Sequence, residues 1–153
     1  MLLDLTARGV AVLGRVPGRS GYHDVSRNPD VGTDPRVLVY RFDAPLFYGN
    51  AERFRARIRR LARRQRPDLI VVDAAGMSDV DASGVRMLTE IERELRGQGV
   101  VLVFADCVGA VKDTFARAGF MLAVDGRLYD TIEEAVVAGQ EPEERAPEGE
   151  GDR

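Results

Sequence analysis

The sequence contains very few residues with specialised side-chain chemistry. Cys107 is the only cysteine and His23 the only histidine among 153 residues. A disulfide framework and a Cys/His metal cluster are therefore excluded, and this sparing use of cysteine fits a reducing compartment. No apolar run approaches the roughly 20 residues needed to cross a bilayer, and the N-terminus lacks the apolar stretch of a signal peptide. The chain as given is expected to be soluble and to form one domain.

Lysine is almost absent as well, since all but one of the 22 basic residues are arginine. An arginine excess accompanies either anion recognition or codon bias, and codon bias is the interpretation we favour. The net charge of -3 averages two unlike regions, because residues 139–153 hold six acids against two arginines. The preceding residues are therefore close to neutral, and the acidic segment 139–153 is expected to be a disordered tail.

Apolar patterning predicts an alternation of strands and helices. Short apolar or β-branched runs predict strands over residues 11–16, 37–42, 69–72, 100–104 and 120–124. Apolar residues at helical spacing predict helices over about residues 50–66, 81–97, 109–118 and 131–138. The segment 19–36 is rich in Gly, Pro, Asp, Asn and Ser, which favours a loop that contains a turn or a short edge strand.

The order of these elements predicts an α/β fold. The runs 69–72 and 100–104 are apolar on both faces, as central parallel strands covered by helices are. The first two strands have no helix between them and are expected to pair antiparallel, with parallel βαβ units after them. We therefore expect one mixed, mostly parallel sheet of four or five strands with about four helices, in a domain that covers residues 10–138.

Candidate site residues follow the ends of the two central strands, because ligands of open α/β sheets bind beyond the carboxyl ends of parallel strands. Ser78 and Asp81 have the spacing of a capping box, and together with Asp79 they are explained by stabilisation of a helix start. The predicted anion- or partner-binding loops contain Ser78, Asp79, Asp81, Gly84, Cys107 and Gly109.

Ser83 differs from these residues, because a serine in the first helical turn has no propensity reason to be there. Its hydroxyl is placed where backbone N–H groups converge, which favours a phosphate or another anion. Asp79 and Asp81 would repel a phosphate, so the position suits a phosphorylation switch better than a permanent anion pocket. Ser83 is the candidate regulatory residue.

Features of an enzyme are weak. His23 has no partner in a recognisable nucleophile arrangement, and Cys107 fits a small packed residue better than a reactive thiolate. The glycine-rich segment 14–20 lacks a Walker lysine, and Pro17 removes a backbone donor that a phosphate-binding loop would need. We predict no enzymatic activity, no metal and no tightly held cofactor.

The segment 53–66 carries eight arginines and is predicted to be a basic amphipathic helix. One stripe of this helix consists of Arg53, Arg57, Arg60 and Arg64. A solvated face is the simplest interpretation, and docking to acidic headgroups or to acidic loops of a membrane partner comes next. Nucleic acid comes last, because no aromatic residues are interleaved and the folded part is nearly neutral.

Two sets of segments resemble a known family, the STAS domain. The strand at 69–73 followed by residues 77–84 resembles the shared STAS element, in which Ser83 stands at the position of the serine that anti-sigma-factor antagonists present to their kinase. Three further segments resemble the SulP (sulfate permease-type) branch of the family, namely Val12–Gly18, Tyr22 with Asp24, and Arg41–Ala51. The last of these is the most specific.

The resemblance implies a STAS fold and a cytoplasmic C-terminal tail of a SulP anion transporter, with residues 1–9 as the linker from a membrane domain missing from this chain. The leading hypothesis is a regulatory or interaction domain at the cytoplasmic face of the membrane, whose partner is the transporter's own transmembrane domain. The alternative is a free-standing anti-sigma-factor antagonist, switched by phosphorylation of Ser83 and bound by a kinase. A weaker alternative is a GTP- or ATP-binding module at the helix starts near Ser83 and Gly109.

Overall fold

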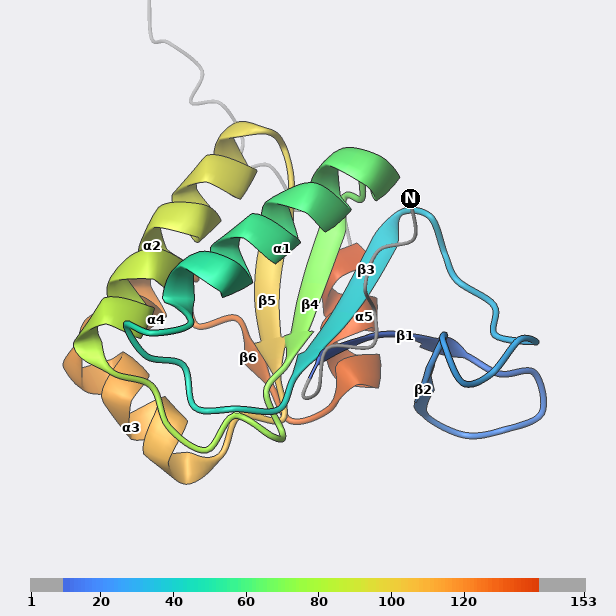
Figure 1. Cartoon of the computed structure of the whole chain (residues 1–153), viewed down its shortest axis with the longest axis horizontal. Helices are drawn as coiled ribbons and strands as arrows, with labels where there is room; N and C mark the ends of the chain where they lie inside the picture. The colour runs from blue at the N-terminus through green and yellow to red at the C-terminus, as the bar shows by residue number, and fades with distance from the viewer. Residues whose placement is uncertain (1–9, 141–153) are drawn as a thin grey trace, which may run out of the picture.

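The computed structural model of the chain describes residues 10–140. The predicted linker at residues 1–9 and residues 141–153 of the predicted tail lie outside this range. The strands are β1 (Val10–Arg15), β2 (Tyr22–Asp24), β3 (Val37–Phe42), β4 (Leu69–Asp73), β5 (Val101–Ala105) and β6 (Leu128–Tyr129). The helices are α1 (Ala51–Gln65), α2 (Ala82–Gly97), α3 (Gly109–Arg117), α4 (Phe120–Ala123) and α5 (Ile132–Gln140). Figure 1 shows their arrangement.

One sheet organises the molecule. Its strand order is β2-β1-β3-β4-β5-β6, with β1 antiparallel to β2 and β3 and with β3 to β6 mutually parallel. The predicted α/β class, the mixed sheet and the antiparallel opening pair are confirmed. The sheet has six strands because β2 lies inside the segment predicted as a loop and the two-residue β6 extends the other edge.

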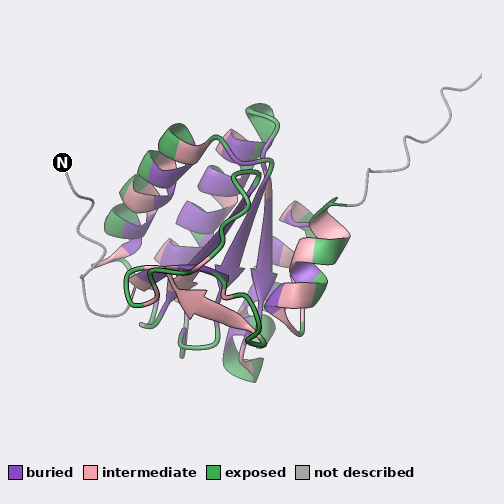
Figure 2. Cartoon of the chain, turned by 90° about the vertical axis from the view of Figure 1, so that its right-hand side faces the viewer, coloured by how far each residue is buried: buried purple, intermediate pink, exposed green. Residues whose placement is uncertain are grey.

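Helices cover both faces of the sheet and separate two cores. Side chains of α1 to α4 pack on one face, where Phe54 meets Tyr40 and Phe42 edge to face at ring distances of 5.6 and 5.1 Å. On the other face α5 lies against β4 and β5 and buries Ile132 and Ala135. Figure 2 shows the buried strands between these helical layers. Burial on both faces is the reason that β4 is apolar along its whole length.

The strand predicted over residues 120–124 is wrong, because these residues form the short helix α4 and the turn after it. A strand would bury positions 120, 122 and 124 together. Instead Phe120 and Val124 are buried, at a spacing of four, while the side chain of Leu122 is 83% exposed. Phe120 packs against Phe104 and Phe115, which fixes the helical spacing. The next edge strand is β6 instead.

Candidate functional site

The segment between β3 and α1 is joined to the segment before α2. Leu46 pairs with Val80 in a parallel bridge. The amide of Leu46 donates to the carbonyl of Asp79 at 2.9 Å, and the amide of Asp81 donates to the carbonyl of Leu46 at 3.0 Å. Two loops that are distant in sequence are therefore held together by backbone hydrogen bonds.

Asp81 is the N-cap of α2 and also holds the neighbouring loop. One carboxylate oxygen accepts a hydrogen bond from the Gly84 amide at 2.7 Å, and the other accepts from the Tyr48 amide at 3.1 Å. The helix starts near residue 81 as predicted, but the predicted capping role of Ser78 is wrong because α2 begins at Ala82, one turn later. Ser78 is exposed instead. The negative charge of Asp81 also suits the N-terminal end of a helix dipole.

Gly84 is required by close packing at the first turn of α2. A Cβ at this position would lie 2.8 Å from a methyl carbon of Val80 and 2.9 Å from the carbonyl oxygen of Leu46. Real Cβ contacts are not this short, so the absence of a side chain lets the Leu46 segment approach the helix. Gly84 therefore allows the loop at Leu46 and the first turn of α2 to pack closely.

Asn50 occupies the N-cap position of α1, but its side chain does not cap that helix. Its Oδ1 accepts from the Phe47 amide at 2.9 Å, and its Nδ2 donates to the Pro45 carbonyl at 2.7 Å. The side chain therefore forms its hydrogen bonds with backbone groups of the loop and not with those of the helix, because that loop turns back over the start of α1. Its tip carries Phe47 and Tyr48, which are 41% and 78% exposed and pack edge to face at 5.5 Å.

Ser83 lines a shallow pocket of about 350 Å³ between this aromatic loop and the first turns of α1 and α2. The other lining residues are Tyr48, Ala51, Glu52, Arg55, Arg86, Met87 and Glu90. Arg55 pairs with Glu90 and lies 3.6 Å from the carboxylate of Glu52. The pocket therefore joins a hydroxyl, two guanidinium groups, two carboxylates and an exposed aromatic ring.

The second predicted loop lies apart from this pocket. Gly109 is exposed at the start of α3, and Cys107 is only 7% exposed. Burial raises the pKa of the Cys107 thiol to about 11, which is the behaviour of a packed residue rather than a nucleophile. Neither residue lines the pocket at Ser83. The hydrogen bond from the Ala74 amide to the Ala105 carbonyl brings only the beginnings of the two loops together.

A buried carboxyl group marks the carboxyl edge of the sheet. Asp73, at the end of β4, is 6% exposed, and one of its oxygens accepts from the Ala75 amide at 3.1 Å. Burial raises the pKa of this carboxyl, the Ala75 hydrogen bond opposes the shift, and the charge of Asp106 adds to it. Arg41 is paired nearby with Asp43 at 3.0 Å.

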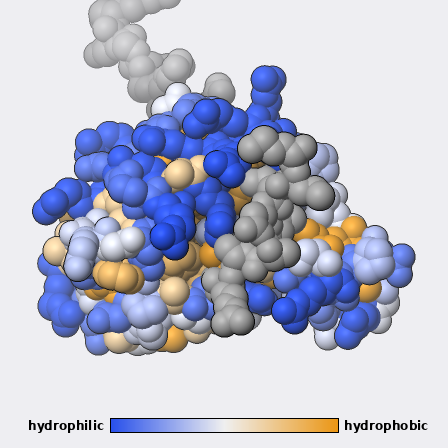
Figure 3. All heavy atoms as spheres, in the orientation of Figure 1, coloured by the Kyte–Doolittle hydropathy of each residue, from blue (hydrophilic) through white to orange (hydrophobic). Residues whose placement is uncertain are grey.

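The arginines of α1 divide into two groups. Arg59 forms a forked pair with Glu94 of α2, at 2.6 Å for the shorter contact, and this hydrogen bond holds the pKa of Glu94 below its usual value. Arg55 faces α2 in the same way. The predicted stripe lies on the outer side, where Arg53, Arg60 and Arg64 are exposed and Arg57 is half-buried. Figure 3 shows that the face with α1 and α2 is largely hydrophilic.

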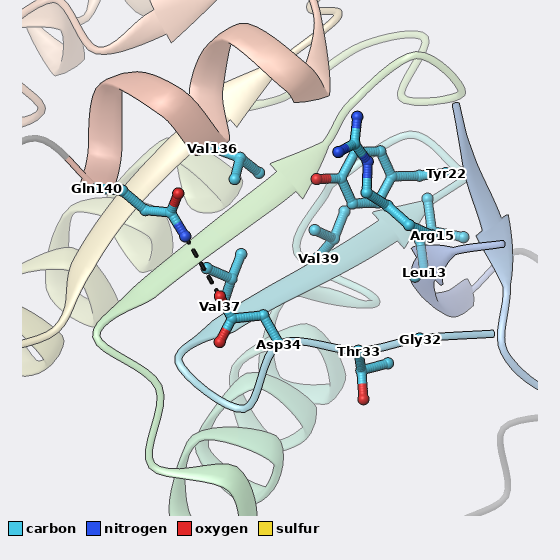
Figure 4. Close-up of a pocket in the computed structure, with 11 residues that line it drawn as sticks. Leu13, Arg15, Tyr22, Gly32, Thr33, Asp34, Val37, Val39, Val136 and Gln140 are labelled. Carbon is cyan, nitrogen blue, oxygen red and sulfur yellow. Dashed lines mark hydrogen bonds between the residues drawn. The ribbon is translucent and has the colours of Figure 1, made fainter. Parts of the chain in front are cut away.

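A second cavity, of about 370 Å³, opens at the other end of the sheet and was not predicted. Leu13, Val37, Val39 and Val136 form its apolar side. At its rim the Arg15 guanidinium lies 5.6 Å from the centre of the Tyr22 ring (Figure 4). The strand β2, which brings Tyr22 there, was hidden in a segment whose composition indicates a loop.

Three neighbours of Ser83 were not predicted from the sequence, namely Tyr48, Arg55 and Arg86. Arg86 follows Ser83 by three residues on one helix, so helical spacing would have found it. Tyr48 and Arg55 approach through the packing of separate segments, and no local pattern indicates that. The described residues contain no helix long and apolar enough to cross a membrane.

Comparison with known proteins identifies the class of this domain. The family model for the STAS domain matches residues 28–135, and the chain therefore belongs to the STAS domain family. The chain is also similar to part of several sulfate transporters. It is 28% identical over 147 residues to sulfate transporter 1.3 of Arabidopsis thaliana and 31% identical over 151 residues to low affinity sulfate transporter 3 of Stylosanthes hamata.

These alignments cover 89% and 90% of this chain but only 22% and 23% of the relatives, so the chain spans less than a quarter of their length. Among solved structures, murine Solute Carrier 26 family member A9, an anion transporter in the inward-facing state, matches with a TM-score of 0.77 at 19% identity. That match covers 88% of this chain and 22% of the transporter chain. The anti-sigma factor antagonist SpoIIAA in its unphosphorylated form matches with a TM-score of 0.59 at 22% identity, over 72% of this chain and 96% of that one. At these identities the structural matches show the shared fold.

Proposed function

We propose that this STAS domain is the cytoplasmic regulatory and interaction domain of a SulP-type transporter of sulfate or a related anion, without transport or catalysis of its own. Similarity to sulfate transporters over 90% of the chain supports the family side of this proposal. The observation that carries the interaction role is the loop around Tyr48. This side chain is 78% exposed although Asp81 and Asn50 fix the surrounding backbone by hydrogen bonds.

An exposed aromatic side chain on a backbone that is held by hydrogen bonds is suited to binding a protein partner. Burying a tyrosine in a partner pocket gives a large contact area at little cost in side-chain entropy, and aromatic residues dominate binding energy at interfaces. Phe47 widens the surface, and Arg86 supplies a polar rim. The partner we propose is the transmembrane domain of the same transporter.

The first test examines the gene that encodes this chain. The open reading frame upstream of Met1 is expected to encode many apolar membrane-spanning segments. A frame that encodes none would remove the transporter assignment, while the STAS family assignment would stand.

The second test measures binding of this domain to the purified transmembrane part of that transporter. Tyr48→Ala is expected to weaken binding by roughly tenfold or more, since interface hot spots exceed about 1.4 kcal/mol. Leu122→Ala is the matched control, because Leu122 is 83% exposed on α4 and belongs to no proposed surface. Equal affinity of the Tyr48→Ala and Leu122→Ala proteins would rule out this loop as the docking surface.

A second candidate function is a partner switch controlled by phosphorylation of Ser83. The observation in its favour is that Ser83 shares its pocket with Arg55 and Arg86, because guanidinium groups form forked hydrogen bonds with phosphate. A phosphate there would compete with Glu90 for Arg55 and would repel Asp81. Binding to a cognate kinase is expected to be lost in Ser83→Asp and kept in Ser83→Ala, and a Ser83→Asp protein that binds normally would end this candidate.

A further inference from the structure

Most arginines of α1 and its C-cap form no ion pair within the part of the chain that the structure describes. The segment 52–66 holds eight arginines and one acid. Arg55 and Arg59 are paired with acids of α2. The other six form no ion pair with any residue in the range 10–140. Four of these six lie along one side of α1, and we call them the arginine face: Arg53, Arg57, Arg60 and Arg64.

The last residues of α1 and α5 both bond to the loop before β3, although the two helices cover opposite faces of the sheet (Figure 2). The side chain of Gln140, the last residue of α5, donates to a carboxylate oxygen of Asp34 at 3.3 Å, as Figure 4 shows. The side chain of Gln65, the last residue of α1, donates to the backbone carbonyls of Asp34 at 3.3 Å and Val37 at 3.0 Å. One short loop thus contacts both helix ends, so the described part of the chain ends near the last turn of α1.

The segment that starts at this point carries the opposite charge. Residues 141–153 contain six acids and two arginines, a net charge of -4. Thirteen residues can extend over at most about 45 Å, whereas α1, with 15 residues, is about 22 Å long. The acids are therefore within reach of the whole arginine face. Their effective concentration there is high because they belong to the same chain.

We propose that the acidic segment 141–153 occupies the arginine face of α1 as an intramolecular electrostatic partner. The segment then shields this face from other anions, and a phosphorylated or acidic partner must displace it to bind. This regulation is independent of the surface at Tyr48 and Ser83, so it goes beyond the proposed function. The experiments below therefore test this proposal separately from the proposed function.

A spin label on the segment tests the contact in the full chain. Gly149→Cys provides the labelling site without removing an acid, and Cys107 stays unlabelled because it is buried with a raised pKa. The label is expected to broaden amide signals of residues 60–66 and to spare those of α3, which lies at the opposite edge of the sheet (Figure 1). The broadening is expected to disappear near 1 M salt, where the screening length falls from about 8 Å to about 3 Å.

A charge-neutral segment of the same length provides the control. In this variant Glu141, Glu143, Glu144, Glu148 and Glu150 become Gln and Asp152 becomes Asn. Broadening at residues 60–66 is expected to be lost in it, and also in Arg60→Gln/Arg64→Gln, but to persist in Arg19→Gln/Arg117→Gln, which removes the same charge elsewhere. Broadening that survives neutralisation would reflect tethering alone and would overturn the proposal, as would its absence from the unmodified segment.

Vesicles distinguish a lipid occupant. Vesicles of phosphatidylcholine and phosphatidylserine are expected to bind the charge-neutral variant several-fold more than the unmodified chain, because the arginine face is uncovered. Equal binding of both proteins, lost in Arg60→Gln/Arg64→Gln, would identify a membrane surface as the occupant and overturn the proposal.

Discussion

Replacing Gly84 by alanine tests whether the start of α2 is locked against the loop before α1. Inside a helix, alanine in place of glycine ordinarily stabilises a protein by roughly 0.5–1 kcal/mol. At Gly84 the new Cβ would lie 2.9 Å from the carbonyl oxygen of Leu46. This oxygen resists displacement because it accepts the Asp81 amide at 3.0 Å, and Leu46 itself is fully buried. We therefore expect the usual gain to be cancelled or reversed.

The magnitude follows from overpacking. Forcing an extra carbon into a well-packed site costs about 1–3 kcal/mol. Gly97, the last residue of the same helix, is the matched control because a Cβ there meets nothing within 4 Å. Gly97→Ala is expected to stabilise the domain by about 0.4–1 kcal/mol. The difference between the two variants then isolates the strain at Gly84.

Thermal and urea unfolding followed by circular dichroism measure this difference. A gap of about 1–3 kcal/mol corresponds to roughly 2–12 °C in Tm for a domain of this size, with Gly84→Ala the less stable variant. If Gly84→Ala raised Tm as much as Gly97→Ala, the contact with Leu46 would be adjustable and the reasoning about a locked loop would be refuted.

Three further predictions concern side-chain chemistry. Cys107, with its pKa raised to about 11, is expected to react with a thiol reagent near pH 8 about a hundredfold more slowly than a free cysteine; equal rates would contradict its burial. The raised pKa of Asp73 means that the folded protein keeps this proton to higher pH than the unfolded chain. The stability of the wild type relative to Asp73→Asn is therefore expected to fall as pH rises through the range just above the ordinary Asp value near 4, and a difference that stays flat in urea unfolding would count against it. Replacing the predicted stripe by Gln is expected to change the unfolding free energy by less than about 1 kcal/mol, since exposed charges contribute little; unfolding instead would show that the stripe is packed. The stripe consists of Arg53, Arg57, Arg60 and Arg64.

Local pattern was a good guide where burial is uniform along an element. The strands β4 and β5 are covered on both faces, so continuous apolar runs marked them in the sequence. The apolar pattern gave a wrong prediction where a short apolar run fits both a strand and a helix. Residues 120–124 are apolar throughout, and only the packing of Phe120 against Phe104 and Phe115 selects a helix over a strand.

The candidate site likewise has features that the sequence predicts and features that it does not. A helix start near Asp81 was predictable, because acids and small polar residues before an apolar helical pattern are typical of one. Which residue caps the helix was not predictable, because Ser78 and Asp81 both have suitable side chains. The choice depends on the Tyr48 amide, which comes from another loop and supplies Asp81 with a second hydrogen bond.

By itself the sequence determined the alternation of strands and helices, the start of α2, the basic character of α1 and the resemblance to the STAS domain. These features are encoded by residues within a few positions of one another. Only the tertiary structure decided which arginines are neutralised by α2, which groups surround Ser83, and that the ends of α1 and α5 meet at Asp34. Most of these contacts join residues that are far apart in the sequence, as Arg59 and Glu94 are. They depend on how the helices pack across the sheet, which no local pattern of residues specifies.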